Sequence, residues 1–559
     1  MELRTLAQQV LFSERIESKL HRPERLVDEA PGPPLRSPDV PARPPGLGLN
    51  EGGERTPFPR LSQLDDPVAR GRVLHFFANH ELLAMELMAV ALLRFTDAPP
   101  AWRMGLARIL LEEQDHMRLY LDRMDALGVR FGEQGVSPFF WTCLADVASP
   151  RDFAAGMSLT FEVANLDWCR FYGAAVREVG DSETDALLER VYQEEIRHVA
   201  HGLRWFRRWK DPKSSDWDAY VRSLSLPLSP ARARGKVFDR AGREAAGLHP
   251  DHIDRLQTFS RSRGRPPWVY SFEGGIEIEA AGRNPNKAVR TLRADLAALP
   301  HLLARADDIV LAPEQRPAFL LQLQEAGFEL PEFRPTIPRA RIIAGLRPFG
   351  VAGDHLRRSA VTALRDDVVV CRSLSEIPDG DIVLKSEFSS SGRGVCFSRD
   401  LEWAAQRLRR DGLVLAEPRY ELVQEVGAQF VDGRFLGFTW PLVDDGIWRG
   451  HLLIPPRGDI RRFLFEGQRA ERFVRALPLP ETCGVDLAVV RQGDTLRLQV
   501  LELNARMTMG HYALALKKRA PWAARFRVVG KRSVPAGAIC LTDPETASTL
   551  VAIAEKDVT

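Results

Sequence analysis

Two short stretches decide the fold of the first half of the chain: Glu113-Gln114-Asp115-His116 and Glu195-Ile196-Arg197-His198. Each reads E-x-x-H, and residues three apart share one face of a helix, so each stretch presents a carboxylate beside an imidazole. A lone glutamate precedes each stretch at nearly the same spacing, Glu81 by 32 residues and Glu162 by 33 residues. Two antiparallel helical hairpins with this spacing would bring all six side chains to one level of a bundle core.

The sequence around these stretches predicts four long helices, because apolar residues recur at spacings of three and four over about 67–95, 101–127, 152–178 and 183–208. Such helices predict an all-α four-helix bundle with one longer crossover at 128–151. The glutamates fall within the apolar rows, where an unpaired charge is unfavourable. Four carboxylates and two neutral imidazoles suit two iron or manganese ions, so the predicted ligands are Glu81, Glu113, His116, Glu162, Glu195 and His198.

Other interpretations of these residues stay open at this point. A single E-x-x-H usually marks a solvated helix face, and its repetition with a matched glutamate is what favours a metal site. Glu86 competes with Glu81 as the first ligand, although the spacing from Glu81 to Glu113 better mirrors that from Glu162 to Glu195. His80 is predicted to support the site or the fold instead of binding metal.

The composition is that of a soluble protein with several domains: 559 residues, 45% hydrophobic, 27% charged, and a formal net charge of +2. This balance favours neither nucleic acid nor membrane as a partner. The six cysteines include no C-x-x-C pair, which predicts a reducing, cytoplasmic compartment. The first 20 residues carry charges unlike those of a signal peptide, and the apolar stretch 82–95 is interrupted by Glu86 and Arg94, so we expect no membrane segment.

Five segments are predicted along the chain. Residues 1–62 hold a short helix and a proline-rich arm, since ten of the 39 residues in 22–60 are proline. Residues 63–262 form the bundle with a basic extension. Short apolar runs then alternate with helical stretches, which predicts an α/β or α+β region made of a small domain at 268–375, a larger one at 376–530 and a tail at 531–559. The runs are 268–272, 308–311, 381–384, 413–416, 436–439, 485–490 and 496–501.

The second half carries a second candidate site. Lys385 ends a predicted strand and is followed by the small-residue loop 389–394, a combination that suits a phosphate group, although it is not a Walker A loop. Two later strands carry Asp486 and the pair Glu502 and Asn504, and alternate residues of a strand share a face. Oxygen ligands of this kind suit Mg²⁺, while a polar edge strand is the alternative interpretation.

The first half resembles the DUF455 family, an uncharacterised group of ferritin-like proteins. The resemblance covers about residues 22–258, including the tail from Pro227 to Leu248, and rests on four stretches: 80–87, 111–116, 161–167 and 192–206. It is similar, more distantly, to the di-iron tRNA hydroxylases and quinone hydroxylases of the ferritin-like superfamily. The resemblance implies the same six metal ligands and an oxidation or hydroxylation that uses O₂, and it leaves the substrate undefined.

The second half resembles the ATP-grasp superfamily over about residues 268–530, with 268–375 similar to its small pre-ATP-grasp domain. The resemblance implies that Lys385 holds the phosphates of ATP and that Glu417 lies at the adenine and ribose hinge. Asp486, Glu502 and Asn504 would hold Mg²⁺, and Arg506 would act near the γ-phosphate. Thr508 and His511 would face the substrate or serve the fold. The loop covering the phosphates would be Ser389, Ser390, Ser391, Gly392, Arg393 and Gly394.

Together these features predict a bifunctional biosynthetic enzyme, in which a di-metal oxidase is fused to an ATP-dependent carboxylate–amine ligase that works through an acyl phosphate. We expect small-molecule or peptide carboxylate and amine substrates, O₂ as a co-substrate, and no membrane partner. A tRNA-modifying hydroxylase with a regulatory nucleotide-binding domain is one alternative, supported only by basic runs at 204–210 and 232–236. A non-catalytic metal-binding bundle fused to an active ligase is the other.

Overall fold

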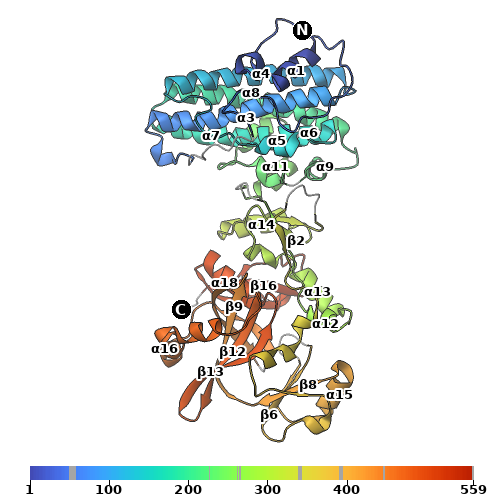
Figure 1. Cartoon of the computed structure of the whole chain (residues 1–559), viewed down its shortest axis with the longest axis vertical. Helices are drawn as coiled ribbons and strands as arrows, with labels where there is room; N and C mark the ends of the chain where they lie inside the picture. The colour runs from blue at the N-terminus through green and yellow to red at the C-terminus, as the bar shows by residue number, and fades with distance from the viewer. Residues whose placement is uncertain are drawn as a thin grey trace. The chain divides into compact units, whose positions relative to one another are not determined.

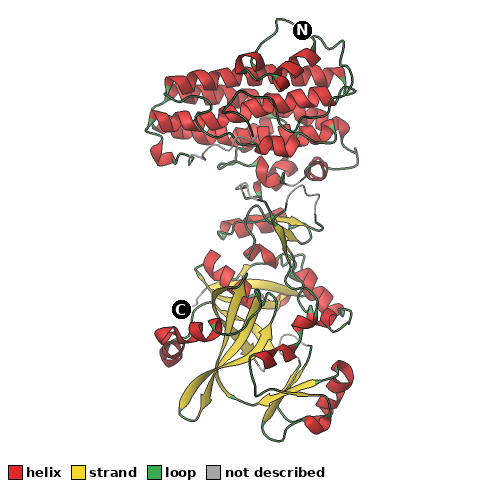
Figure 2. Cartoon of the chain, in the orientation of Figure 1, coloured by secondary structure: helices red, strands yellow, loops and turns green. Residues whose placement is uncertain are grey.

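The computed structural model describes the chain except for residues 50–57, 226, 261, 263–265, 338–342, 389–393, 445–446 and 557–559. The chain divides into two compact units, shown in Figure 1. The first is Met1–Pro266 with Pro338–Ile343, and the second is Pro267–Ile337 with Ala344–Thr559. The helical first half and the mixed second half confirm the predicted fold class, as the distribution of helices and strands in Figure 2 illustrates.

The core of the first unit is the predicted four-helix bundle. Three of its helices are α3 (Pro67–Arg94), α4 (Pro100–Ala126) and α8 (Ser182–Trp209). The fourth is a composite helix that lies between α4 and α8 in the chain. The composite helix runs through α6 (Pro150–Gly156), the π-helical turn η2 (Met157–Glu162) and α7 (Val163–Glu178). Proline at the first position of α3 and α4 and a capping aspartate before α3 and α8 set where these helices begin.

Helix α3 is almost wholly buried, because α1, α4 and α5 all pack against it. By length and composition alone it could cross a membrane, but 89% of its most apolar window is buried inside the protein. A core helix of a bundle passes that test for the same reason that a membrane helix does. The finding is therefore weak evidence for a membrane span.

The N-terminal segment packs against the bundle. Helices α1 (Leu3–Phe12) and α2 (Ile16–Lys19) and the proline-rich arm after them cover α3 and α4, and the arm is held by backbone contacts such as the bond from Leu35 N to Leu93 O. Glu86 accepts bonds from Lys19 Nζ at 3.0 Å and from Arg43 Nη2 at 2.6 Å, and all three side chains are fully buried. Glu86 is thus an anchor for the arm, which settles its competition with Glu81.

Shorter helices complete the first unit. Helix α5 lies in the crossover, and the remaining ones follow α8 and pack on the bundle. Buried Asp167 on α7 binds both Nη atoms of Arg243, at 2.5 and 2.9 Å, and so ties this C-terminal extension to the core. These helices are α5 (Phe139–Leu144), α9 (Asp216–Ser223), η3 (Pro230–Ala233), α10 (Arg240–Ala245) and α11 (Pro250–Gln257).

The described residues of the second unit form three sheets. One is parallel, in the order β3-β2-β1-β4, and one is antiparallel, in the order β5-β8-β6-β7. Their strands are β1 (Trp268–Tyr270), β2 (Ile309–Leu311), β3 (Glu332–Arg334), β4 (Gly345–Arg347), β5 (Val369–Cys371), β6 (Ile382–Ser386), β7 (Val395–Cys396) and β8 (Val414–Pro418). The helices that accompany them are α12 (Glu277–Ala280), α13 (Lys287–Asp295), α14 (Pro317–Glu325) and α15 (Leu401–Asp411).

The third sheet is antiparallel and has eight strands, in the order β13-β12-β9-β10-β11-β14-β16-β15. The strands are β9 (Glu421–Val431), β10 (Arg434–Asp444), β11 (Ile447–Leu452), β12 (Cys483–Gln492), β13 (Thr495–Asn504), β14 (Ala523–Gly530), β15 (Ile539–Cys540) and β16 (Leu550–Lys556), with helices α16 (Gly458–Phe465), α17 (Arg469–Arg475) and α18 (Met509–Arg519). Residues 531–559 were expected to be a tail, but β16 pairs with β14 along its whole length. Its buried run 551–554 belongs to the sheet core.

Candidate metal centre and nucleotide site

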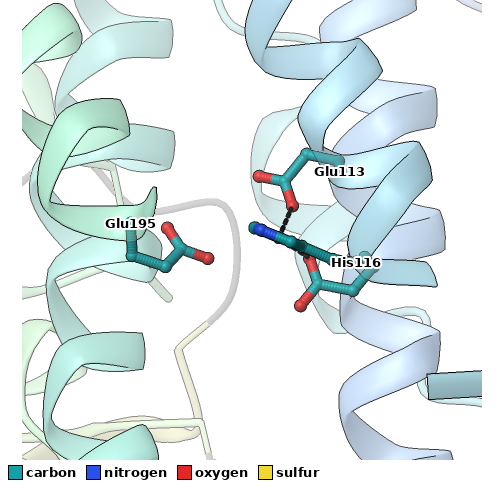
Figure 3. Close-up of side chains that lie close together, drawn as sticks. Glu113, His116 and Glu195 are labelled. Atoms are coloured by element: carbon teal, nitrogen blue, oxygen red, sulfur yellow. Dashed lines mark hydrogen bonds and ion pairs between the residues drawn. The ribbon is translucent and has the colours of Figure 1, made fainter. Parts of the chain in front are cut away.

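The six predicted metal ligands come together inside the bundle. Glu81 lies on α3, Glu113 and His116 on α4, Glu162 at the end of η2, and Glu195 and His198 on α8. None is more than 5% exposed. They form two groups, and within each group the possible ligand atoms all lie within 4.8 Å of one another. One group is Glu81, Glu113, His116 and Glu195, and the other is Glu113, Glu162 and His198. Figure 3 shows Glu113, His116 and Glu195 pointing toward a common centre.

Both histidines turn Nδ1 toward the cluster. His116 Nδ1 lies 3.0 Å from Glu113 Oε2, and His198 Nδ1 lies 3.2 Å from Glu113 Oε1 and 3.5 Å from Glu195 Oε2. Glu113 therefore contacts both imidazoles and belongs to both ligand groups. Glu113 is thus the residue that the two groups of candidate ligands share.

Several buried atoms of the cluster have no hydrogen-bond partner among the residues that the structure describes. They are Glu81 Oε1, both carboxylate oxygens of Glu162, Glu195 Oε2 and His198 Nδ1. Leaving such groups unsatisfied in an apolar core costs free energy, and buried charges are normally paired or bound to metal. All five atoms are of the kinds that bind iron, manganese or zinc. The residues present thus fit a di-metal site.

The electrostatics of the cluster point the same way. Burial, and next the charge of Glu113, raises the pKa of Glu81 well above its ordinary value. Burial and the charge of Glu195 raise the pKa of Glu162 to about 8. Burial lowers the pKa of His116, but hydrogen bonds with Glu113 and Glu194 outweigh it and raise the value to about 9. Without metal the cluster therefore retains protons, and metal ions would have to displace them.

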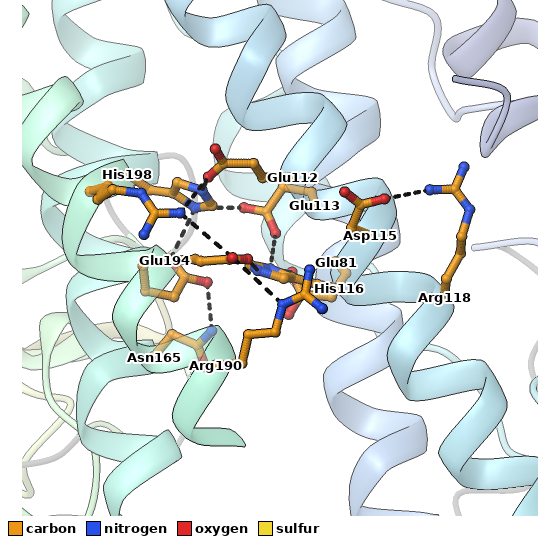
Figure 4. A network of polar contacts seen from close by, with 12 residues as sticks. Glu81, Glu112, Glu113, Asp115, His116, Arg118, Asn165, Arg190, Glu194 and His198 are labelled. Atoms are coloured by element: carbon orange, nitrogen blue, oxygen red, sulfur yellow. Dashed lines mark hydrogen bonds and ion pairs between the residues drawn. The ribbon is translucent and has the colours of Figure 1, made fainter. Parts of the chain in front are cut away.

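An outer pair of glutamates orients the two histidines. His116 Nε2 lies 2.7 Å from Glu194 Oε2, and His198 Nε2 lies 2.9 Å from Glu112 Oε2. Glu112 on α4 contacts the histidine of α8, and Glu194 on α8 contacts the histidine of α4. The two pairs therefore cross between the helices, as Figure 4 shows. A carboxylate at Nε2 fixes the tautomer and leaves Nδ1 free for a metal. The sequence analysis missed this pair, whose signal is the Glu-Glu doublet that opens each motif.

The ligand Glu162 lies at the end of the π-helical turn η2. Such turns widen a helix locally and often occur at functional sites. The hydroxyl of Thr160 within the turn contacts Ala155 O at 2.8 Å and the Tyr220 hydroxyl at 2.9 Å. These contacts stabilise a turn that an uninterrupted α-helix would not form.

A pocket of about 820 Å³ adjoins the cluster. The four ligand carboxylates form part of its wall. The rest of the wall includes aromatic rings on α5, η2 and α7 and two arginines next to η3, namely Phe139, Phe140, Phe161, Trp168, Arg232 and Arg234. A substrate in this pocket would lie directly against the metal ligands. His80 also lines the pocket and stacks on Phe140, with ring centroids 4.5 Å apart.

The predicted nucleotide residues line one pocket of about 460 Å³ in the second unit. Lys385 on β6 contacts Glu417 on β8 at 2.5 Å and donates to Leu501 O at 3.1 Å. Arg506 pairs with Glu277 and donates from Nη2 to Asn504 Oδ1 at 3.2 Å. The structure thus brings the predicted phosphate lysine and hinge glutamate together, and it places the arginine beside the predicted Mg²⁺ ligands.

The predicted Mg²⁺ ligands lie side by side on β12 and β13. Asp486 is the register partner of Glu502, and Asn504 Nδ2 donates to Asp486 Oδ2 at 2.9 Å. Burial and the charge of Glu502 raise the pKa of Asp486 to about 7. Burial opposes ionisation of Glu502 too, but Arg358 at 3.0 Å and Lys385 outweigh it and lower its pKa. A hard divalent cation would be well matched to these oxygen atoms.

The remaining predicted residues differ in outcome. Ser389, Ser390, Ser391, Gly392 and Arg393 lie outside the described residues, and Gly394 O accepts from Ser386 N at 2.8 Å. His511 is buried against Phe430 O, and Thr508 caps α18, so both have structural partners.

Sequence reasoning missed two arginines that pair with glutamates of this pocket. Arg358 binds Glu502, and Arg365 binds Glu417 at 2.5 Å. Neither arginine belongs to a recognisable motif, so the sequence carried no signal for either.

Comparison with known proteins agrees with the two resemblances. Residues 4–254 match the family described as "Protein of unknown function (DUF455)", which confirms that resemblance for the first unit. No curated protein matches the chain significantly.

Solved structures similar to the second half include N5-carboxyaminoimidazole synthetase from Staphylococcus aureus complexed with ADP, at 8% identity and a TM-score of 0.31, covering 53% of this chain and 94% of that one. A putative ATP-grasp superfamily protein from Archaeoglobus fulgidus matches at 13% identity and a TM-score of 0.29, covering 52% of this chain and all of that one. At such identities and TM-scores these matches leave the activity open, so it has to be argued from this chain's own side chains.

Proposed function

We propose that the first unit is a di-iron or di-manganese oxidase or hydroxylase and that the second unit is an ATP-dependent carboxylate–amine ligase. One observation carries the oxidase half: six buried carboxylate and imidazole ligands, five of their atoms without hydrogen-bond partners, beside a pocket large enough for a substrate. A structural bundle would need neither the unsatisfied atoms nor the pocket. The proposal names no substrate for either half.

The chain's own residues would each serve this oxidation differently. Metal ions at the cluster would supply the activation of O₂. Glu112 and Glu194 hold the two imidazoles with Nδ1 inward, so the ligands are oriented before metal arrives. The aromatic residues of the pocket exclude water from the reacting centre, which strengthens every electrostatic interaction there.

The ligase half rests on the nucleotide pocket. Lys385 and Arg506 would place positive charge on the phosphates, while Asp486, Glu502 and Asn504 would hold Mg²⁺ with ATP as the co-substrate. The ligase would transfer the γ-phosphoryl group of ATP to a carboxylate, which gives an acyl phosphate and ADP. An amine would then attack the acyl carbon and release phosphate. A cytoplasmic location is part of the proposal, in keeping with six cysteines that form no disulfide.

The oxidase half is tested by metal content per chain. We expect about two iron or manganese ions in the parent after anaerobic loading with ferrous or manganous ion, and a large loss in Glu113→Ala and His198→Ala. Glu189→Ala is the matched control, because Glu189 lies on α8 outside the cluster and pairs with Arg170 at the surface. A parent that binds no transition metal would refute the oxidase and leave the bundle as a scaffold.

The ligase half is tested by nucleotide binding and by ADP release. We expect Mg²⁺-dependent ATP binding that Lys385→Ala weakens by about tenfold or more and that Lys517→Ala, at an exposed position of α18, leaves unchanged. A screen of carboxylate and amine pairs should find one that stimulates ADP release. ATP binding without stimulation by any pair would favour a regulatory nucleotide-binding module instead, and absence of ATP binding would refute both.

A further inference from the structure

The pocket beside the metal cluster has a strongly uneven distribution of charge. Its inner wall carries Glu81, Glu113, Glu162 and Glu195, and another part of its wall carries Arg232 and Arg234. We propose that this pocket binds a small organic anion with an apolar, ring-containing body, whose anionic group pairs with the arginines. This inference rests on the proposed oxidase function, and it names the substrate class of that site.

The aromatic wall is built to accept a flat, apolar body. Phe140 stacks on Phe161 with ring centroids 3.7 Å apart and planes inclined by 10°. Phe139 meets Phe161 edge-on at 6.1 Å, and Trp168 joins them from α7. Aromatic rings prefer such stacked and edge-on contacts with other rings. A ligand of this kind would extend a stack that the protein has already begun.

Arg234 brings a positive charge to the wall of the pocket. Its Nη1 donates to the carbonyl oxygens of Gln257 and Phe259, which hold the guanidinium in place. Its Nε is buried without a hydrogen-bond partner, and no carboxylate of the described residues forms an ion pair with it. Arg232 adds a second positive charge, with its guanidinium 4.0 Å from the ring centre of Phe139. Guanidinium groups favour carboxylate, sulfonate or phosphate ligands.

Asp167 makes this arrangement rigid. Its carboxylate accepts from Gly235 N and Asp239 N, each at 2.7 Å, and it also binds Arg243. The backbone next to Arg234 is therefore fixed to α7. The same helix carries Trp168, and it begins directly after the metal ligand Glu162. Helix α7 thus connects the end of η2, which carries Glu162, with Trp168 of the pocket wall and with the arginine segment.

Charge also sets the orientation of the ligand. An anionic group would be repelled by the four cluster carboxylates and attracted by the arginines. The apolar body would therefore face the metal cluster, where oxidation would occur. The pocket volume of about 820 Å³ lies within the range of about 300–1,000 Å³ that is typical of small-molecule sites.

A pair of fluorescent probes tests the proposal on the full-length, metal-loaded protein. The first is 8-anilinonaphthalene-1-sulfonate, and the second is N-phenyl-1-naphthylamine, which has the same rings without the sulfonate. We expect Arg232→Gln and Arg234→Gln to lower the affinity for the sulfonate probe by about tenfold. The affinity for the uncharged probe should change by less than about twofold. Phe140→Ala should lower the affinity for both probes. Arg208→Gln, at an exposed position of α8, is the control and should change neither.

The outcomes separate this inference from the proposed function. If the sulfonate probe binds no differently in either arginine variant, or if Phe140→Ala spares both probes, the substrate class is wrong. Metal content is measured on the same samples, so two ions per chain with a failed probe pattern would reject the substrate class alone. A parent without metal would reject the proposed oxidase, whatever the probes do. Should Arg234→Gln fail to fold, Arg232→Gln decides the result.

Discussion

At the scale of single residues, what distinguishes the candidate metal centre is the crossed pair of glutamates behind the two histidines. Glu112 and Glu194 sit one position before a ligand, yet each contacts the histidine of the opposite helix. They are partly exposed, at 35% and 18% of the side chain, while the ligands are buried. Their contribution is therefore to orient the imidazoles, and their loss should weaken metal binding without unfolding the bundle.

Replacing either outer glutamate should lower metal affinity. For Glu112→Gln and Glu194→Gln we expect a loss of about 10- to 100-fold, because an amide orients the imidazole less firmly and makes it less basic. Competition with a chelator of known affinity measures this change. Glu189→Gln, at the surface of α8 and outside the cluster, serves as the control. Unchanged metal affinity in both outer variants would refute the orienting role.

A capping aspartate should make stability depend on pH. Asp181 caps α8 and binds Arg70 and Arg123, each at 2.7 Å. Burial opposes its ionisation, but hydrogen bonds from Thr184 and the two arginines outweigh it and hold its pKa below the ordinary 3.8. A lowered pKa stabilises the fold above the unfolded-state value, and that stability is lost as pH falls through the folded-state value.

We therefore expect the free energy of unfolding of the parent to fall on acidification below about pH 4, and Asp181→Asn to show a smaller fall from a lower starting value. Urea titrations across pH measure both. Equal pH dependence in the parent and the variant would contradict the assignment.

At the scale of elements, the sequence was informative wherever periodicity and burial coincide. The four long helices and the six buried ligands followed from apolar spacing, because in a bundle that spacing defines the core. Glu86 could not be assigned in this way, since it is as buried as Glu81 and only the partners Lys19 and Arg43 distinguish the two. Arg358 and Arg365 escaped notice because their carboxylate partners are distant in sequence.

The anchor of the arm should be costly to break. In Glu86→Gln the carboxylate that pairs with two buried cations disappears, and we expect destabilisation of about 3–5 kcal/mol. Replacing Lys19 by Met in that background should recover part of the loss, because one unpaired charge is then removed. Denaturant unfolding followed by circular dichroism gives both values, with Glu189→Gln as the exposed control. A loss below about 1 kcal/mol would show that the buried network is not an anchor.

At the scale of the whole molecule, each unit carries its own candidate ligand set. Metal should therefore protect the first unit and nucleotide the second, each by about 2.7 kcal/mol at a hundredfold excess over the dissociation constant. Hydrogen exchange resolved by peptide measures this. Removing metal with a chelator should speed exchange in α4 and α8, and adding ATP with Mg²⁺ should slow it in β12 and β13. Protection of only the opposite unit by either ligand would contradict the assignment.

The buried pairing of the arm has a consequence for the order of synthesis. Lys19 and Arg43 leave the ribosome before Glu86, which follows them by 67 and 43 residues. Neither cation can be buried at acceptable cost until its carboxylate is present. The arm must therefore remain hydrated while α3 is being translated, and it closes over the bundle only afterwards. A segment that is made before α3 is thus among the last parts of its unit to reach its final place.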